Sequence, residues 1–291
     1  MVIWFFALVC GKRQRSFVRT GLFLPKLPED EHPRNATWPV HDRAFLLYGS
    51  KRNEVLSLLE IERYGLDSFV DPDYLSIYGM LPCEWYGCGI RLLGRTAVEC
   101  TPDALGDRIG RDVASVATCM PSNQFVVIDL FAGSCNALFW ILRHLPDSEG
   151  IGFESDAKVF ELTHRNLAAL GQRIEVVNGD YARLLERYRL PKDRGIVAFV
   201  SPPWGTALDE VQGLDLNRTT PPISEVIEQV VRRFSEHKIL FAIQVYEKVS
   251  APSLNRIRTR LDWTELHIYD INERGRNTGV LLGSQGWKPP R

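Results

Sequence analysis

The 291-residue sequence has almost no net charge and no regular framework of cysteines. Lysine and arginine total 35 and aspartate and glutamate total 36, so the net charge is −1. A protein with this balance has no global field that attracts nucleic acid or an anionic membrane, and any such contact needs a local patch. The cysteines stand irregularly at 10, 83, 88, 100, 119 and 135. We therefore expect reduced thiols and no metal site, in a protein of the cytoplasm or, in a eukaryote, the nucleus.

The sequence also lacks an apolar run of the length that crosses a membrane. Residues 1–10 are strongly apolar, but a spanning helix needs about 20 such residues. Positive charges follow this segment, whereas they precede the apolar part of a signal peptide. We expect a core strand here, with a weak signal anchor as the alternative, and no membrane partner.

A short basic stretch follows the apolar segment. Lys12, Arg13, Arg15 and Arg19 meet no acidic residue before Glu29. A solvated surface segment is one interpretation, and a basic arm that contacts the phosphates of RNA or a nucleotide is the other.

Residues 1–100 favour a small, mainly helical domain. Leu46, Leu47 and Leu58 belong to a set of apolar residues at near-helical spacing between 41 and 66, and glycines and prolines punctuate 67–100. Thr101-Pro102-Asp103 predicts the start of the next helix, with Thr101 as its N-cap. We place a domain boundary here, between residues 1–100 and 101–291.

From residue 125 onward, strand and helix patterns alternate. This alternation predicts a three-layer α/β fold with a Rossmann-like, mostly parallel sheet of seven strands. The last two strands are joined by a short link, which predicts an antiparallel edge at the C-terminal end. The expected strands are 125–130, 150–154, 174–177, 196–200, 239–245, 267–271 and 280–282, and the expected helices are 137–145, 157–170, 182–188, 223–235 and 253–261.

Three acidic residues lie at or just after the carboxyl ends of the first three of these strands. Asp129 lies near the end of the first and precedes a small-residue turn in which Gly133 can adopt a positive φ. Glu154 ends the second, where a carboxylate can accept hydrogen bonds from ribose hydroxyls. Asp180 follows the third and can accept from an adenine amino group, with Tyr181 against the ring. Each acid alone could be a surface carboxylate or a helix cap, but their order favours a nucleotide-like ligand.

The most specific motif is Ser201-Pro202-Pro203-Trp204-Gly205, directly after the fourth strand. The Ser201 hydroxyl and the Pro202 carbonyl can accept the N–H groups of a planar amine and direct its lone pair toward a methyl donor. Consecutive prolines stiffen these acceptors, and Trp204 can stack on a heteroaromatic ring. A rigid turn with a core tryptophan is the alternative.

Together these motifs resemble class I S-adenosylmethionine-dependent methyltransferases, over residues 101–283. Ser-Pro-Pro-Trp-Gly is most similar to the trimethylguanosine synthase family, which methylates the exocyclic N2 of the guanine in an RNA cap. The resemblance implies S-adenosylmethionine as the cofactor and no metal. It also implies the catalytic residues Ser201, Pro202, Pro203 and Trp204, and the cofactor-binding residues Thr101, Asp103, Asp129, Phe131, Gly133, Asn136, Glu154, Asp180 and Tyr181.

The sequence departs from the family pattern at two places. Cys135 stands where the family has a glycine, and Thr206-Ala207 replaces the Gly-Pro that usually follows Trp-Gly. The leading hypothesis is N-methylation of a guanine-like base in RNA. A small-molecule methyltransferase and a non-catalytic cofactor-binding module are the alternatives.

Overall fold

The computed structural model describes residues 40–122, 124–172, 174–209, 211–271 and 277–290. The apolar segment at residues 1–10 and the basic arm with Lys12, Arg13, Arg15 and Arg19 lie outside the described residues. Residues 40–291 form one compact unit. The domain boundary expected at residue 100 lies inside this unit and stays a prediction.

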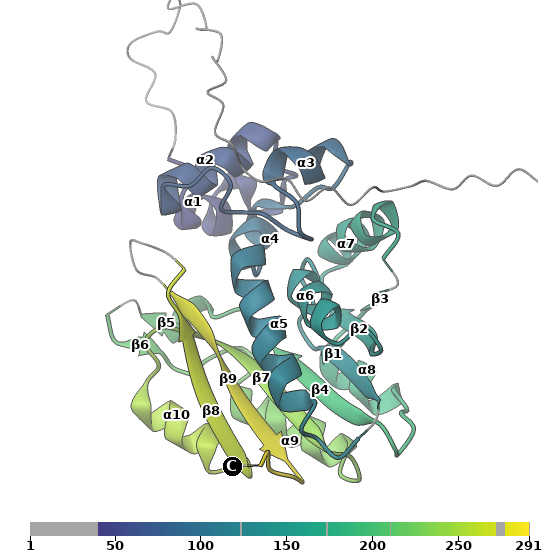
Figure 1. The fold of residues 1–291 in the computed structure, drawn as a ribbon. Coiled ribbons are helices and arrows are strands. Elements are labelled where there is room, and N and C mark those ends of the chain that lie inside the picture. Colours follow the sequence, from purple (N-terminus) through teal and green to yellow (C-terminus); the bar gives the residue numbers. More distant parts are fainter. Residues whose placement is uncertain (1–39, 123, 173, 210, 272–276, 291) are drawn as a thin grey trace, which may run out of the picture. The chain divides into compact units, whose positions relative to one another are not determined.

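Short helices make up most of the described chain ahead of residue 100 (Figure 1). The longest of them begins with a reciprocal capping box, in which Glu60 N–H donates to the Ser57 hydroxyl and Ser57 N–H donates to the Glu60 carboxylate. None of the helices within the described residues has the length and hydropathy needed to cross a bilayer. The elements are α1 (Arg43–Tyr48), η1 (Ser50–Asn53), α2 (Leu58–Phe69), α3 (Pro82–Gly87) and α4 (Gly94–Glu99).

A seven-stranded sheet forms the centre of the remaining chain, in the order β3-β2-β1-β4-β7-β9-β8. Every neighbouring pair from β3 to β7 is parallel, and β9 is antiparallel to both of its neighbours. The predicted antiparallel C-terminal edge is confirmed, with β9 inserted between β7 and the edge strand β8. The strands are β1 (Phe125–Asp129), β2 (Glu149–Glu154), β3 (Glu175–Asn178), β4 (Gly195–Val200), β7 (Ile239–Tyr246), β8 (Trp263–Tyr269) and β9 (Thr278–Gln285), and a separate small hairpin pairs β5 (Leu208–Asp209) with β6 (Gly213–Leu214).

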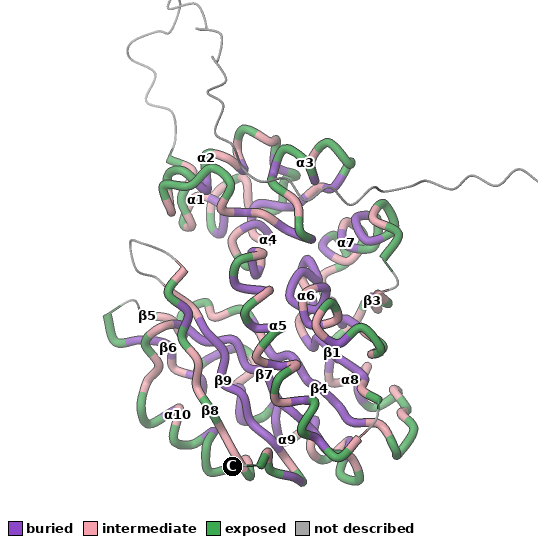
Figure 2. Tube along the Cα trace, viewed as in Figure 1, coloured by how far each residue is buried: buried purple, intermediate pink, exposed green. Residues whose placement is uncertain are grey.

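Helices cover both faces of the sheet, which gives the predicted three layers. Alternate residues of each central strand belong to different apolar cores: Val127 packs in one, and Val126 and Ile128 pack in the other. Figure 2 shows these buried strands between more exposed helices. The first core lies under α5 (Asp103–Ala117), α6 (Asn136–His144) and α7 (Ala157–Ala169), and the second lies under α8 (Tyr181–Arg187), α9 (Ile223–Arg233) and α10 (Ala251–Arg258).

The strand order reverses between β1 and β4. From β1 the chain proceeds outward through β2 and β3, whereas β4 lies on the other side of β1 and leads to β7. In open α/β sheets, ligands bind outside the carboxyl ends of the strands at such a reversal. The turn after Asp129 and the corner that begins at Ser201 flank this point.

The predicted N-cap of α5 is wrong. The helix begins at Asp103 and Pro102 occupies the cap position, with no capping hydrogen bond from a side chain. The Thr101 hydroxyl donates instead to Gln244 Oε1, at 2.9 Å. Both side chains are buried, and a buried amide oxygen without a partner is costly, so the tertiary contact replaces the local cap.

Candidate active site

A cavity of about 670 Å³ lies at the carboxyl ends of the central strands. The ends of β1, β2 and β4 contribute to its wall, together with helices α1 and α4 of the preceding region. A volume of this size is typical of a site that holds a cofactor or drug-sized ligand. Of the residues predicted from the sequence, those that line the cavity are Thr101, Asp129, Phe131, Gly133, Asn136, Glu154, Asp180, Tyr181, Ser201, Pro202, Pro203 and Trp204.

The turn after β1 is held by the carboxylate at the end of β2. Gly133 adopts the predicted positive φ, at 50°, and its N–H donates to Glu154 Oε2 at 2.9 Å. The other carboxylate oxygen, Oε1, accepts the N–H of Asp156 at 2.7 Å. Two loops that are far apart in sequence are thus fixed by one side chain, and the cofactor-side wall has little freedom left to lose on binding.

Burial raises the pKa of both acids at this end of the cavity. The pKa of Asp129 rises to about 7, because its side chain is taken out of water and the Glu154 carboxylate lies nearby, although the Phe131 N–H stabilises the charged form. Burial also raises the pKa of Glu154, against the two backbone N–H groups that lower it. A cationic ligand in this cavity would therefore stabilise the charged form of both acids.

Asp180 and Tyr181 begin α8 and lie at the same cavity. The Asp180 side chain caps this helix by accepting the Arg183 N–H at 3.2 Å, so the cap considered from the sequence is present. Asp180 still lines the cavity. Tyr181 is buried, and its ring lies 5.0 Å from the Phe131 ring at an interplanar angle of 49°. These rings form an apolar wall suited to a flat ring system.

Asp103 and Asn136 serve mainly to join parts of the protein. Asp103 does not line the cavity, and its carboxylate accepts from the Gly79 N–H at 2.8 Å and the Trp140 indole N–H at 2.5 Å. Asn136 borders the cavity, but its side chain accepts from the Tyr78 N–H and donates to the Thr101 carbonyl, both at 2.7 Å. Their contribution to cofactor binding stays a prediction, and in this structure they position the wall.

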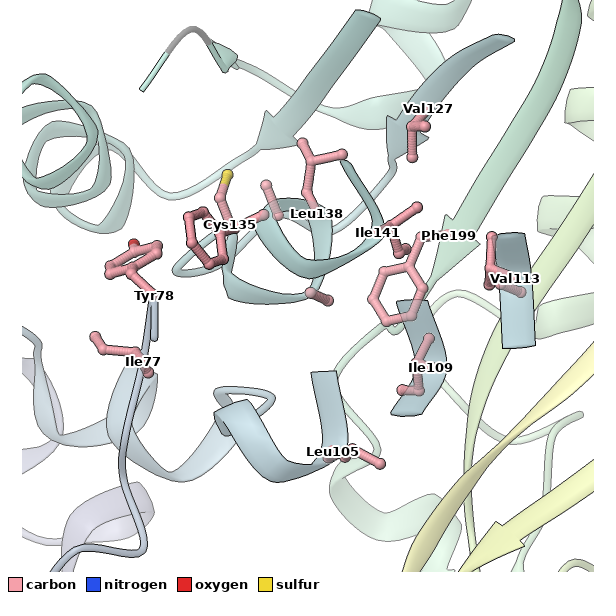
Figure 3. Close-up of a cluster of buried hydrophobic side chains, with 14 of the residues drawn as sticks. Ile77, Tyr78, Leu105, Ile109, Val113, Val127, Cys135, Leu138, Ile141 and Phe199 are labelled. Carbon is pink, nitrogen blue, oxygen red and sulfur yellow. The ribbon is translucent and has the colours of Figure 1, made fainter. Parts of the chain in front are cut away.

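Cys135 adopts a left-handed conformation with φ 59°, which a glycine takes more easily. Its side chain is fully buried, and Figure 3 shows it among core residues between Tyr78 and Leu138. Cys135 is absent from the residues that line the cavity. The cysteine is accommodated in part because Gly152 on β2 leaves space for it: a Cβ at Gly152 would lie 3.0 Å from the Cys135 sulfur.

The Ser-Pro-Pro-Trp corner forms the other end of the cavity. Pro202 is buried, Ser201 and Trp204 are half-buried, and Pro203 is exposed. The Trp204 ring meets the Tyr246 ring edge-on, with centroids 6.3 Å apart at 70°. Both residues line the cavity, and Trp204 is half-buried, packed against the second core but not enclosed by it.

The sequence interpretation missed Gln244 on β7. Its Oε1 accepts from the Thr101 hydroxyl at 2.9 Å and from the Ser201 hydroxyl at 3.2 Å, and the residue lines the cavity. The available signal was a single polar residue within an otherwise apolar strand up to Tyr246. A lone glutamine in a fully buried strand needs partners, which makes it a candidate for a site.

The sequence interpretation also missed arginines of the helical region. Arg43, Arg52 and Arg95 line the cavity, and all three lower the pKa of Glu99, which burial raises. Arg95 is paired with Asp156 at 2.6 Å, but its Nε is buried without a hydrogen-bond partner. Periodicity could place these residues on helices, but it could not show that their side chains meet at one cavity.

The residues around the cavity fit a nucleoside with a cationic tail. Carboxylates at the ends of β2 and β3 can accept from ribose hydroxyls and a ring amine, aromatic rings form one wall, and the small turn at Gly133 allows close approach. S-adenosylmethionine has these parts and supplies, when bound, a methyl group on a positively charged sulfur. Among the described residues, no group of three or more His, Cys, Asp or Glu is placed to hold a metal ion.

The sheet order and this cavity define a class I S-adenosylmethionine-dependent methyltransferase. A family model described as RNA cap guanine-N2 methyltransferase matches residues 125–281, which is just over half of the chain. The chain belongs to this family. S-adenosylmethionine is its cofactor, and methyl transfer is the activity that the family is described by.

Solved structures of methyltransferases share parts of the fold. A protein from Listeria monocytogenes, described as a class I S-adenosylmethionine-dependent methyltransferase, is 15% identical with a TM-score of 0.44, over 66% of this chain and 63% of that one. The chain thus spans less than two thirds of that protein. The N-terminal domain of human METTL16 in complex with SAH is 14% identical with a TM-score of 0.44, over 62% and 68% of the respective chains. An rRNA methylase from Streptococcus thermophilus is 16% identical with a TM-score of 0.40, over 60% and 94%. No curated protein matches the sequence significantly.

Proposed function

We propose that this protein methylates the exocyclic amine of a guanine-like base in RNA, at N2 as in cap guanine methylation. The observation that carries the proposal is the Ser-Pro-Pro-Trp corner, which lines the same cavity as the carboxylates at the ends of β1 and β2. The acceptor corner and the cofactor side flank the reversal of strand order, so a ligand at each would face the other across one short space.

The chemistry of the corner suits an amine whose lone pair is delocalised into a ring. Such an amine becomes a better nucleophile when acceptors bind its N–H groups and turn the lone pair out of the ring plane. The Ser201 hydroxyl and the Pro202 carbonyl are acceptors of this kind, and the adjacent Pro203 restricts their movement. Transfer breaks the bond from the methyl carbon to sulfur and forms one to nitrogen, and a proton then leaves the nitrogen to water.

Trp204 supports a planar acceptor. It lies two residues after Pro202 and lines the cavity beside Tyr246, so a ring stacked on the indole can present its edge to Ser201. A base that already carries a methyl at N7 is positively charged, and an indole face attracts a cation more strongly than a neutral ring.

The arginines of the helical region favour a nucleotide over an uncharged metabolite. Arg43 and Arg52 line the same cavity, and the carboxyl that they influence, Glu99, has its pKa raised by burial. Guanidinium groups bind phosphate oxygens through paired N–H donors. We propose that they meet the phosphates of the acceptor, and that the basic arm at Lys12, Arg13, Arg15 and Arg19 adds contacts to a longer RNA.

A labelled-methyl transfer assay tests this function. Purified protein is incubated with S-adenosylmethionine and, separately, a 7-methylguanosine cap dinucleotide, GTP, total RNA or a mixture of uncharged heterocycles. The product is digested and identified by mass spectrometry. We expect N2-methylated guanosine, formed from the cap dinucleotide or RNA. Transfer to uncharged heterocycles alone would establish a small-molecule enzyme. Cofactor binding without transfer to any of these acceptors would contradict the proposed guanine methylation and favour a binding module.

A further inference from the structure

We propose that Gln244 is a positioning residue that sets the direction of the Ser201 hydroxyl hydrogen bond, so that the lone pairs of Ser201 face the acceptor amine. This inference rests on the proposed function, because it assigns Ser201 to the acceptor. Gln244 lies on β7, 43 residues after Ser201 in the sequence.

Strand register brings the two residues together. β4 and β7 are parallel, and Val200 is paired with Ile243 at the carboxyl end of the pair. The next residue of each strand is therefore Ser201 beside Gln244. Because side chains alternate between the faces of a sheet, Gln244 lies on the face that carries Ala242, which packs in the core beneath α5. Thr101, directly ahead of α5, meets Gln244 on this same face.

The hydrogen bonds around Gln244 use the hydroxyl protons of both partners. Gln244 Oε1 accepts from Thr101 at 2.9 Å and from Ser201 at 3.2 Å. A hydroxyl group has one proton and two lone pairs. Once the Ser201 proton points to Gln244, Ser201 has only lone pairs to offer to the cavity.

This polarity matters for the reaction. A hydroxyl that donated to the acceptor amine would bind the nitrogen lone pair that must attack the methyl group. A hydroxyl that accepts an amine N–H leaves that lone pair free and can take up positive charge as the bond forms. Thr101 donates to the same oxygen, Oε1, and holds the amide in place, so Gln244 does not need to reorient when the acceptor enters. Within the described residues, Gln244 makes side-chain hydrogen bonds through Oε1 alone, and its amide nitrogen is left for a ligand.

A double-mutant cycle tests the coupling. We would make Gln244→Met, which keeps the length of the side chain without its acceptor, together with Ser201→Ala and the double variant. With a 7-methylguanosine cap dinucleotide, Gln244→Met is expected to lower kcat on the order of tenfold in the wild-type background. It should have little further effect when Ser201 is already alanine, since the cycle isolates the interaction between the pair. The affinity for S-adenosylmethionine, measured by calorimetry, should stay within about twofold of the wild type in all variants.

Gln244→Glu distinguishes the acceptor oxygen from the amide nitrogen. Glutamate offers only oxygens toward Ser201 when ionised, so it should restore most of kcat if Oε1 is the working atom. A loss as large as that of Gln244→Met would indicate that the nitrogen, rather than the oxygen, is required, and would overturn the inference. Ser284→Ala serves as the matched control: it removes a buried hydroxyl that bonds the Trp287 carbonyl outside the cavity lining, and kcat should be unchanged.

Thermal denaturation of the same four proteins, without any methyl acceptor, measures the coupling a second time. The hydrogen bond predicts that the Tm losses of Ser201→Ala and Gln244→Met are not additive in the free protein. Additive losses would overturn the geometry whatever the substrate is. If wild-type protein methylates no guanine acceptor, the proposed function fails, while the Tm cycle still decides whether Gln244 holds Ser201. Coupling in Tm with additive losses in kcat would limit Gln244 to a structural role.

Discussion

The two ends of the cavity differ in how far the protein has already satisfied its own polar groups. At the cofactor end, both oxygens of Glu154 accept backbone N–H groups, and Asp129 accepts another. At the acceptor end, the Ser201 and Thr101 hydroxyls donate to Gln244, but the Gln244 amide nitrogen makes no side-chain hydrogen bond within the described residues, and Trp204 is half-buried beside the cavity. One end is a set of loops fixed by internal hydrogen bonds, and the other is a stiff corner with a largely free face.

The difference indicates what each end contributes. The cofactor can bind to a wall that is ordered before it arrives, because folding has already covered the loss of conformational entropy. The acceptor end instead depends on side chains brought from β7 and the helical region, such as Gln244 and Arg43. Substitutions at the first end should therefore affect folding and cofactor affinity, and those at the second should affect turnover.

The largest effect is expected for Asp129→Asn, on the stability of the free protein. Burial raises the pKa of Asp129 from 3.8 to about 7 in the folded state. The folded state thus binds a proton more tightly than the unfolded state, so stability from this group is present below about pH 4 and is lost as the pH rises to about 7. At pH 8 the difference corresponds to at most about 4 kcal/mol, at 1.36 kcal/mol per pKa unit. Asparagine carries no such cost, so the variant should become the more stable protein as the pH rises.

Urea denaturation of both proteins between pH 5 and pH 8 measures this effect. The gap in unfolding free energy between Asp129→Asn and wild type should widen up to about pH 7 and then level off. Addition of S-adenosylmethionine should narrow it, since a cation in the cavity stabilises the carboxylate. A gap that does not change with pH would mean that Asp129 is ionised throughout this range.

A smaller effect, confined to the acceptor end, is expected for Trp204→Ala. Loss of stacking should lower kcat/KM for a cap dinucleotide, by an amount that corresponds to about 1–3 kcal/mol of transition-state stabilisation. The affinity for the cofactor should stay the same. Trp204→Phe should retain most of the activity, because phenylalanine still offers a ring face. Steady-state kinetics and calorimetry give the two quantities. Equal losses of turnover and cofactor affinity would show that Trp204 does not face the acceptor.

Much of the fold was predictable because each strand and helix carries its own pattern. The buried runs that became β1 and β4 are short, apolar and bounded by turn residues, and their ends place Asp129 and Ser201 at one sheet edge once the sheet is parallel. The positive φ at Gly133 followed from local chemistry alone. The same local reasoning failed at Thr101, where a strong capping signal was overruled by a buried partner from β7.

The rest could not be predicted because it depends on contacts between distant segments. Asp103 has the sequence position of a ligand-binding acid, but Trp140 and Gly79 occupy its oxygens. Gln244 and Arg95 carry no motif, and only the pairing of β7 with β4 and the ion pair of Arg95 with Asp156, at the start of α7, bring them to the cavity. Local patterns determine which elements form, whereas the partners of a polar side chain depend on the whole fold.

A third test returns to the cofactor end with Glu154→Gln. Glutamine keeps one acceptor oxygen but loses the negative charge, and hydrogen bonds to charged groups are worth more than neutral ones. Cofactor affinity should fall by about 1.5 kcal/mol, or roughly tenfold, with a smaller change in kcat at saturating cofactor. Glu161→Gln is the matched control, since Glu161 is an exposed acid on α7 outside the cavity lining. If calorimetry gave Glu154→Gln the same affinity for S-adenosylmethionine as the wild type, the negative charge of Glu154 would play no part in holding the cofactor.

The smallest effect is expected at the helical wall, the part of the cavity lining that α1 and α4 contribute, and its size should depend on the salt concentration. Arg43→Gln removes one guanidinium from the cavity, and Arg63→Gln removes the same charge from an exposed position on α2 outside the cavity lining. If Arg43 meets a phosphate of the acceptor, its loss should weaken binding of a cap dinucleotide by less than about 1 kcal/mol, seen as a higher KM. The plot of log affinity for this acceptor against log salt concentration should become less steep by about 1. Arg63→Gln should change neither. KM is measured for both variants from 50 to 300 mM salt. A change that both variants share reflects the overall charge, whereas a loss that is independent of salt and seen only in Arg43→Gln reflects packing. Only a salt-dependent loss confined to Arg43 supports an acceptor with phosphates, and it would make the helical wall part of the acceptor end.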